Sequence, residues 1–179
     1  MKTLTMLCCL LLTQSLGTKG YIEETLERCD SPERMAAIKD ILSHYGLYGD
    51  VPLSCPLKAA YRVSSPYGWR NHPVTGKRMF HTGTDMAVSL ATPVYAAAAG
   101  EVIWSGLKGG YGRCVMVRHK YGFTTLYGHL CAYYVRKGER VRQGTPVGFV
   151  GSTGISTGDH LHYEVRKNGK AVCPYLPVR

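Results

Sequence analysis

Residues 56–179 contain a series of short strand-like runs, and these runs constrain the fold more than any other feature of the sequence. The runs are rich in Val, Tyr, Thr and other residues that favour strands, and the turns between them are rich in Gly, Lys and Arg. No segment after residue 46 has a helical period, and residues 120–122 are typical of a hairpin turn. The runs lie at residues 94–97, 101–104, 114–118, 123–127, 147–150 and 160–165. This pattern predicts a mainly β fold, built as an antiparallel sheet, a sandwich or a small open barrel.

The first twenty residues form a separate segment with the features of a secretory signal peptide. Lys2 precedes an apolar run at residues 4–12, which is shorter than the roughly 18 apolar residues that span a bilayer. Small residues at Ser15 and Gly17 precede a cleavage position. We therefore expect a protein exported to the periplasm, the cell wall or the medium, with no transmembrane segment in the mature chain. The cysteines within the apolar run leave lipid anchoring as an alternative.

Charge divides the remaining chain into two parts. Residues 21–55 carry seven acids and three bases, a net charge of −4, whereas residues 56–179 carry five acids and seventeen bases, a net charge of +12. The basic part predicts an anionic partner, which could be nucleic acid, a membrane or a cell wall. A signal peptide argues against nucleic acid, and no pattern of aromatic residues interleaved with basic ones accompanies the charge.

The acidic leader, as residues 21–55 are called below, contains one predicted helix and a linker at residues 48–56. Ser31 is placed as an N-cap, Pro32 occupies the first helical position, and Gly46 ends the helix. Apolar residues recur every three or four positions at Met35, Ile38, Ile41, Leu42 and Tyr45. We favour a helix that docks on the body through this face. The alternative is a segment that covers a cleft of the basic body and restrains its activity until removed.

The cysteines do not form a structural zinc motif. Outside the signal segment five remain, with no C-x-x-C pair among them, so a four-cysteine zinc site is excluded. An odd number in an oxidising compartment leaves at least one thiol without an intramolecular partner. A disulfide between Cys29 and Cys55 would join the leader to the body and stays a hypothesis. Cys114 and Cys131 are expected to be small buried hydrophobic residues.

Histidine placement is the strongest functional signal. His160 and His162 are two apart in a strand-like run, so their side chains point to the same face. His81 and Asp85 are four apart in a segment whose Thr-Gly-Thr disfavours helix, so they also share a face if the chain is extended. His129 closes another run. Two histidines and one carboxylate with an open fourth position suit catalytic zinc. The other histidines (His44, His72 and His119) are expected to be ordinary hydrogen-bonded residues.

Taken together and in this order, the motifs resemble the lysostaphin/LytM-type zinc metallopeptidases. The resemblance covers about residues 60–176, which is almost the whole basic body, and does not extend to the leader. It rests on residues 64–70, 80–87, 91–100, 127–130, 151–154 and 160–165. It implies a mainly antiparallel sheet with a groove across it, and a peptidase domain at residues 56–179.

The resemblance also implies the roles of the site residues. His81, Asp85 and His162 match the ligands of one Zn²⁺ per chain, and His129 and His160 match the two histidines that line the open metal position. The implied activity is an exported zinc metalloendopeptidase that hydrolyses the cross-links or stem peptides of bacterial peptidoglycan through a zinc-bound water. Either His129 or His160 takes the proton of that water. The intact set disfavours the alternative, a non-catalytic wall-binding or regulatory module of the same fold.

Four neighbours of these motifs have two possible roles each. Glu164 shares a strand face with His162 and either bonds it or forms a surface salt bridge, and we favour the salt bridge. Arg70 either orients a ligand or pairs with a surface acid, and we favour the surface pair. Tyr127 and Tyr163 either line the groove or pack in the core, and packing is the more common role.

Overall fold

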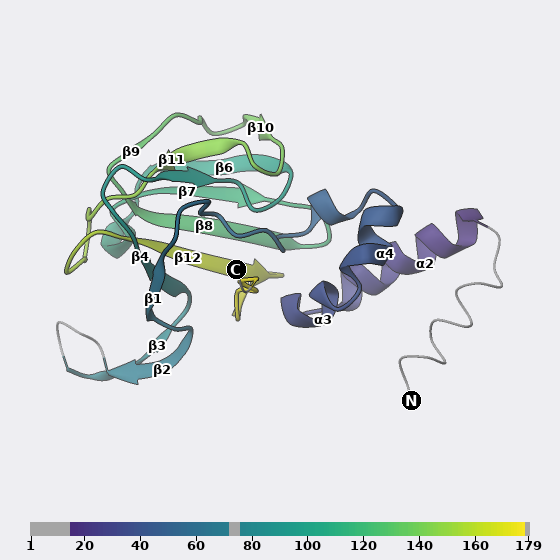
Figure 1. The fold of residues 1–179 in the computed structure, drawn as a ribbon, viewed down its shortest axis with the longest axis horizontal. Coiled ribbons are helices and arrows are strands. Elements are labelled where there is room, and N and C mark those ends of the chain that lie inside the picture. The colour runs from purple at the N-terminus through teal and green to yellow at the C-terminus, as the bar shows by residue number, and fades with distance from the viewer. Residues whose placement is uncertain (1–14, 72–75, 178–179) are drawn as a thin grey trace.

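The computed structural model describes residues 15–71 and 76–177, in which short helices at the N-terminus pack against one end of a β-rich body (Figure 1). No helix in these ranges is long and apolar enough to cross a membrane. Most of the expected signal peptide lies outside the described residues. The helical elements are α2 (Ser15–Arg28), α3 (Pro32–Ala36), α4 (Lys39–His44) and the short 3₁₀ turns η1 (Tyr48–Asp50) and η2 (Gly109–Tyr111).

The body is built on one large antiparallel sheet, as the strand-like runs predict. Its strands follow the order β1-β4-β12-β8-β7-β6-β10, with β13 paired to β12. They are β1 (Arg62–Ser65), β4 (Thr84–Ala87), β6 (Gly100–Leu107), β7 (Arg113–Arg118), β8 (Phe123–Leu130), β10 (Arg140–Val141), β12 (His160–Lys167) and β13 (Lys170–Val172). A three-stranded sheet contains β5 (Pro93–Tyr95), β11 (Pro146–Phe149) and β9 (Ala132–Tyr133), and a two-stranded hairpin contains β2 (Gly68–Asn71) and β3 (Arg78–His81). The prediction of a mainly β, antiparallel fold is confirmed.

All six predicted runs are strands, and the predicted hairpin turn joins β7 to β8. Tyr121 and Gly122 both adopt a positive φ there, the conformation that the tightest hairpin turns require. The prediction missed the strands between residues 62 and 87, although this region holds two of the predicted site residues. Strands β1, β2 and β3 are largely exposed, so they lack the alternation of buried and exposed residues on which the prediction depended.

The leader is helical, with its start and its end where the sequence places them. The Ser31 side chain accepts a hydrogen bond from the Arg34 backbone at the start of α3, Pro32 opens the helix, and Gly46 adopts a positive φ after α4. The single predicted helix is divided in two, because the Ile38 backbone bonds Met35 three residues back and tightens the chain between α3 and α4.

Helix α2 was not predicted, and it crosses the expected boundary at residue 20. Its buried face carries Thr18, Ile22 and Leu26 at four-residue spacing, a helical stripe that continues into the expected signal segment. The expected linker also packs into the core, where Val51 and Leu53 are buried. The leader therefore contributes to the hydrophobic core of the body.

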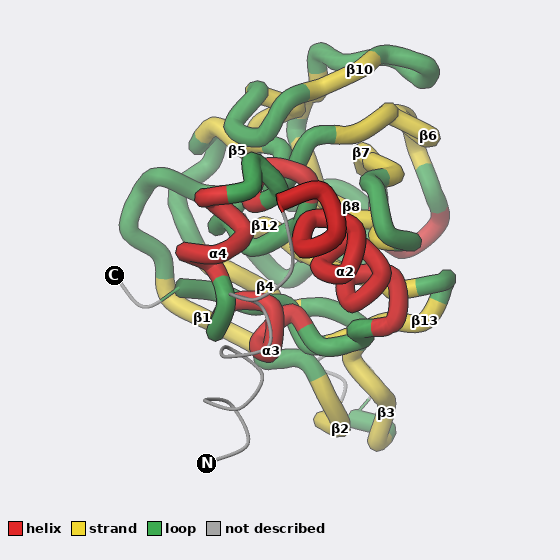
Figure 2. The backbone as a smooth tube through the Cα atoms, turned by 90° about the vertical axis from the view of Figure 1, so that its right-hand side faces the viewer, coloured by secondary structure: helices red, strands yellow, loops and turns green. Residues whose placement is uncertain are grey.

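The leader docks at the end of the sheet opposite the histidine motifs. Lys167, at the end of β12, donates from Nζ to the carbonyl oxygens of Leu26 in α2 (2.8 Å) and of Tyr121. Lys120 pairs with Asp50 at 2.7 Å. β12 begins at His160 and runs eight residues to this contact, a length of roughly 23 Å. Figures 1 and 2 show the helices gathered at this one end. Docking through the apolar face is confirmed, because Met35 and Leu42 are buried in the core. The leader does not cover the histidines.

The cysteines of the described residues are all free thiols. Cys29 and Cys55, which the sequence suggested as a disulfide, are not bonded to each other in this structure. Cys114 is fully buried, as expected, and Cys131 is partly buried.

Candidate metal centre

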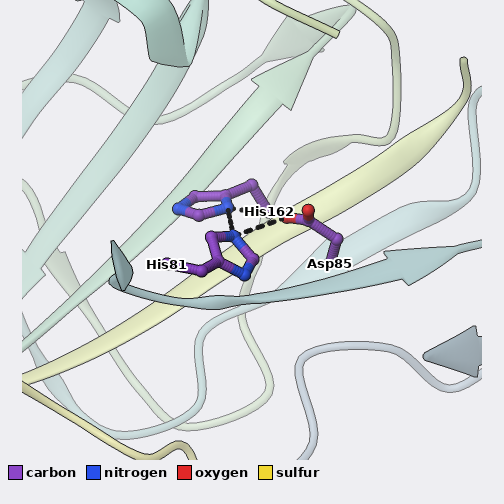
Figure 3. A group of neighbouring side chains, drawn as sticks. All are labelled: His81, Asp85 and His162. Carbon is purple, nitrogen blue, oxygen red and sulfur yellow. Dashed lines mark hydrogen bonds and ion pairs between the residues drawn. The ribbon is translucent and has the colours of Figure 1, made fainter. Parts of the chain in front are cut away.

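Three side chains from three strands converge on one point, as Figure 3 shows. His81 ends β3, Asp85 lies in β4 and His162 lies in β12. Nε2 of His81 is 3.2 Å from Nδ1 of His162 and 3.2 Å from Oδ1 of Asp85, and His162 Nδ1 is 2.7 Å from the same oxygen. All three residues are buried. Two nitrogens and one carboxylate oxygen at these separations form a group that could hold a metal ion.

A turn brings His81 and Asp85 together, not a shared extended segment. The chain leaves β3 after His81 and enters β4 at Thr84, passing Gly83 between them. A Cβ atom on Gly83 would lie 2.6 Å from the Tyr163 carbonyl oxygen of β12, a distance that real Cβ atoms do not adopt. Only glycine permits this close approach. The prediction that His81 and Asp85 lie close together is therefore correct, but its reason, even spacing along an extended segment, is wrong.

The outer nitrogens of both histidines are bonded to protein acceptors. His81 Nδ1 lies 2.9 Å from the carbonyl oxygen of Pro66, and His162 Nε2 lies 3.1 Å from Oε1 of Glu164. A carbonyl or a carboxylate can only accept, so both outer nitrogens carry hydrogen. The inner nitrogens are then free to bind a cation. This arrangement fits the usual support of metal-bound histidine.

Electrostatics also favour a positive charge at this point. Burial alone would raise the pKa of Asp85, but hydrogen bonds with His162 and His81 outweigh it and hold that pKa well below its usual range. Burial opposes a charge on His162, but its bonds to Asp85 and Glu164 raise its pKa. A metal ion bound at the inner nitrogen of His162 would take the place of a proton there. The donor set therefore fits zinc.

Glu164 is a buried partner of His162, so the surface salt bridge favoured from the sequence is wrong. Its side chain has no exposed area. It accepts hydrogen bonds from Thr82 Oγ1 at 2.5 Å, from the Tyr111 hydroxyl at 2.9 Å and from Arg166 Nε at 2.7 Å. Burial would raise the pKa of this carboxyl, but the hydrogen bonds from His162 and Thr82 lower it to about 2. Glu164 is therefore ionised and held from four directions.

The surface ion pair predicted for Arg70 is wrong, whereas the core packing predicted for the two tyrosines is correct. Arg70 contacts Asp85 Oδ2 through Nη2 at 3.4 Å, so it pairs with a buried carboxylate of the centre and not with a surface acid. Tyr127 and Tyr163 are fully buried and stacked on each other with ring centroids 5.6 Å apart. Their predicted role in core packing is confirmed.

His129 and His160 lie on the open side of the centre, with ring centroids 4.6 Å apart. Nδ1 of His129 bonds the Thr153 carbonyl at 2.8 Å, and Nδ1 of His160 bonds the Gly158 carbonyl at 2.8 Å. Nε2 is thus the unprotonated nitrogen of each neutral ring. His160 Nε2 is 3.8 Å from Asp85 Oδ1. The structure therefore brings all five predicted site residues together.

His129 has two further unusual properties. Its φ is +60°, a left-handed conformation that costs free energy in a residue other than glycine and is common at functional sites. Burial, together with the nearby His160 and His162, lowers the pKa of His129 to about 4. Its ring is therefore neutral at pH 7 and free to accept a proton.

A cavity opens above the five residues. One wall is formed by Met79 and Phe80 of the β2–β3 hairpin, and the other walls by Tyr111 and by residues 155–157. Tyr111 was not singled out from the sequence, because a lone tyrosine in a glycine-rich turn carries no periodic signal. No residue of the leader lines this cavity.

The other histidines do not contribute to the centre. His119 is buried and bonded to the Ala99 carbonyl and to Thr125 Oγ1, both at 2.8 Å, as expected for an ordinary core histidine. His44 is exposed at the end of α4, and His72 lies outside the described residues.

The sequence is similar to curated bacterial peptidases. It is 53% identical over 113 residues to the DD-carboxypeptidase/endopeptidase Mpg of Neisseria meningitidis, a match that covers 63% of this chain and 26% of the relative. It is 45% identical over 109 residues to the peptidoglycan DD-endopeptidase ShyC of Vibrio cholerae, covering 60% of this chain and 25% of the relative. The matched part thus spans about a quarter of the length of these relatives.

The fold is similar to those of solved peptidases. A zinc-containing peptidase from Vibrio cholerae aligns with a TM-score of 0.63 and 34% identity, over 69% of this chain and 39% of that one. The catalytic domain of lysostaphin from Staphylococcus simulans aligns with a TM-score of 0.58 and 31% identity, over 64% of this chain and 89% of that one. Residues 79–174 match the model of peptidase family M23. Because this match covers more than half of the chain and includes all five converging residues, the protein belongs to peptidase family M23.

Proposed function

We propose that this protein is an exported zinc metalloendopeptidase that hydrolyses peptide bonds in the cross-links or stem peptides of bacterial peptidoglycan. The observation that carries the proposal is the convergence of His81, Asp85 and His162, with both histidines bonded at their outer nitrogens and two further histidines on the open side. The names of the curated relatives support the reaction and the substrate.

One zinc ion per chain is held by His81 Nε2, Asp85 Oδ1 and His162 Nδ1 in this proposal. When bound, zinc supplies a Lewis acid that polarises the scissile carbonyl and makes water acidic enough to react near neutral pH. Arg70 holds the second oxygen of Asp85, and Glu164 holds His162. These contacts keep the three donors directed at one point.

His129 and His160 carry the proton transfers. Each has its Nδ1 bonded to a backbone carbonyl, so each presents Nε2 to the reacting groups. One of the two accepts the proton of the attacking water at Nε2, and the Nε2–H formed in this way then donates a hydrogen bond to the tetrahedral intermediate or passes the proton to the leaving amine. Burial lowers the pKa of His129, so its ring is neutral before the reaction.

Export is supported by the sequence of residues 1–20, and the wall as a substrate by the charge of the body. A net charge of +12 on residues 56–179 favours association with the anionic polymer. The periplasm or the cell wall is then the place of action. The acidic leader is a part of the folded core, because its helices bury apolar residues against the body.

Purified sacculi provide the test. The zinc-loaded protein should release fragments with new amino and carboxyl termini, and mass spectrometry of these fragments identifies the bond. His162→Ala should abolish release, whereas His44→Ala, a change of an exposed histidine far from the centre, should not. A protein that binds zinc and sacculi but never produces new termini would establish the alternative, a non-catalytic wall-binding module.

A further inference from the structure

The β2–β3 hairpin carries two exposed aromatic side chains, Trp69 and Phe80, and the half-buried Tyr67 directly precedes it. These three residues are called here the aromatic platform. Trp69 and Phe80 are directly opposite in the register of the hairpin. The Phe80 ring lies edge-on to both others, with centroids 5.1 Å from Tyr67 and 5.5 Å from Trp69. The Tyr67 hydroxyl is anchored on the Ala171 carbonyl at 3.0 Å. The rings therefore form one ordered surface.

The rings of Trp69 and Phe80 are exposed to solvent and are not packed into the core. Trp69 is 65% exposed and Phe80 41%, and both views of the chain show the hairpin projecting from the body (Figures 1 and 2). A contiguous exposed aromatic surface is a common sign of a binding site. Trp69 is not part of the hydrophobic core, so core packing does not explain its presence at this position.

The aromatic platform is continuous with the cavity of the metal centre. Phe80 and its neighbour Met79 line that cavity, and Phe80 directly precedes His81. Trp69 lies one strand across from Phe80, so its Cα is roughly 6–7 Å from that of His81. A ligand that enters the cavity and extends past Phe80 reaches the Trp69 ring.

Charge around the platform selects an anionic polymer. The Arg78 guanidinium stacks over the Trp69 ring at 5.3 Å, and no acid occurs in the sequence between Asp50 and Asp85. Lys77 directly precedes β3 and is exposed. This stretch is complementary to the carboxylates of stem peptides.

The aromatic rings select the sugar part of such a polymer. Stem peptides consist mainly of small residues and carboxylates, which offer no broad apolar face, whereas the C–H face of a pyranose ring matches an indole in size. A stem of about four residues spans roughly 13 Å when extended, enough to join a bond at the metal centre to a sugar on the platform. On the basis of the proposed function, we propose that the aromatic platform binds the glycan strand of peptidoglycan, with an N-acetylhexosamine stacked on Trp69.

Tryptophan fluorescence tests sugar binding without any need for hydrolysis. The chain has two tryptophans, so Trp104→Phe leaves Trp69 as the only one. Adding a tetramer of N-acetylglucosamine should change the emission of this variant in a saturable manner. An unchanged emission at millimolar sugar would overturn the inference, even if the protein hydrolyses sacculi.

Sacculus binding tests the consequence for the natural polymer. In a His129→Ala background, which prevents digestion, Trp69→Ala should weaken binding to purified sacculi roughly tenfold, the scale of one aromatic contact with its buried area. The matched control Tyr134→Ala removes an aromatic ring that is also exposed but lies outside the cavity, and should leave binding unchanged. Equal binding by the two variants would contradict the inference.

Hydrolysis separates this inference from the proposed function. Trp69→Ala should raise KM roughly tenfold more for glycan-bearing muropeptides than for a cross-linked peptide dimer without sugar. A wild-type protein that cuts neither substrate would defeat the proposed function, while the fluorescence result would still decide the inference. If Trp69→Ala abolishes binding to phosphatidylglycerol vesicles but leaves sacculus binding intact, the ligand of the platform is a membrane and the inference is overturned. A concentration-dependent dimer that the same change abolishes would replace the glycan by a second copy of the chain.

Discussion

Nε2 of His81 and Nδ1 of His162 face each other at 3.2 Å, and the outer nitrogen of each ring is bonded to a protein acceptor. Two neutral imidazoles held in this way cannot hydrogen-bond each other, because neither inner nitrogen then carries a hydrogen. A cation between them removes the conflict.

Replacing Glu164 should weaken zinc binding while the ligands remain in place. Glu164→Gln removes the negative charge that holds His162 Nε2. The same carboxylate accepts hydrogen bonds from Thr82, Tyr111 and Arg166. We expect the dissociation constant for zinc to rise about 10–100-fold, the usual effect of removing such a support. Competition with a chromogenic chelator measures it. Glu101→Gln, which changes a surface pair with Arg118, is the control, and equal affinities of the two variants would contradict the prediction.

Removing the Tyr111 hydroxyl should produce a smaller effect of the same kind. Tyr111→Phe keeps the ring, which lies 5.5 Å from the His162 ring, but removes one of the hydrogen bonds to Glu164. We expect zinc affinity to fall by a factor of roughly 3–10, since a typical hydrogen bond contributes a net of about 0.5–1.5 kcal/mol. The same chelator competition applies. A variant with wild-type affinity would show that the hydroxyl does not support the centre.

An alanine at position 83 should destabilise the whole domain. Its Cβ would overlap the Tyr163 backbone and contact His162 and Glu164, so β4 or β12 must shift. We expect Gly83→Ala to lower the free energy of unfolding by about 1–3 kcal/mol, the usual cost of overpacking. Denaturant unfolding checks this value. Gly49→Ala, where no atom lies within 4 Å of the added Cβ, should be close to wild type, and similar losses in both would contradict the argument.

Removing the leader should unfold the body instead of activating it. The leader buries Leu26, Val51 and Leu53, and each such side chain contributes about 1.5–3 kcal/mol. Their sum is comparable to the whole stability of a typical domain. A chain that begins at residue 56 should therefore lose cooperative thermal unfolding, measured by circular dichroism. A shortened chain that unfolds cooperatively and hydrolyses sacculi faster than the chain from residue 21 would favour restraint by the leader.

Acid should destabilise the metal-free protein through His119. Burial lowers the pKa of His119 to about 4 from its ordinary value of 6.5, so the folded chain binds fewer protons than the unfolded chain between these values. Stability is then fully present above pH 6.5 and falls as the pH drops toward 4, by about 3 kcal/mol. Urea unfolding with excess chelator at pH 7 and pH 4.5 measures this loss. His119→Gln should reduce the difference between the two pH values, whereas the control His44→Gln should retain it.

The central strands and the proximity of His160 to His162 could be predicted because their signals lie in residues that are neighbours in the sequence. Alternation places His160 and His162 on one face of β12 without any knowledge of the rest of the fold. The hairpin between β7 and β8 follows from residues 120–122 in the same way. These features depend on neighbouring residues only.

Other features depend on contacts between distant segments. The buried state of Glu164 requires Thr82, Tyr111 and Arg166 to meet, and no local pattern reports such a meeting. Helix α2 and residues 48–56 bury apolar side chains because they cover one end of the sheet. The exposed strands β2 and β3 keep their place through pairing with each other, so they lack a buried face that a sequence pattern could reveal.

Diffraction from crystals of the zinc-loaded protein, recorded on both sides of the zinc absorption edge, locates the metal. We expect one zinc ion per chain, about 2.0–2.2 Å from His81 Nε2, Asp85 Oδ1 and His162 Nδ1, with His129 and His160 on its open side. Zinc bound at another position, or coordinated through Glu164 in place of Asp85, would contradict this expectation.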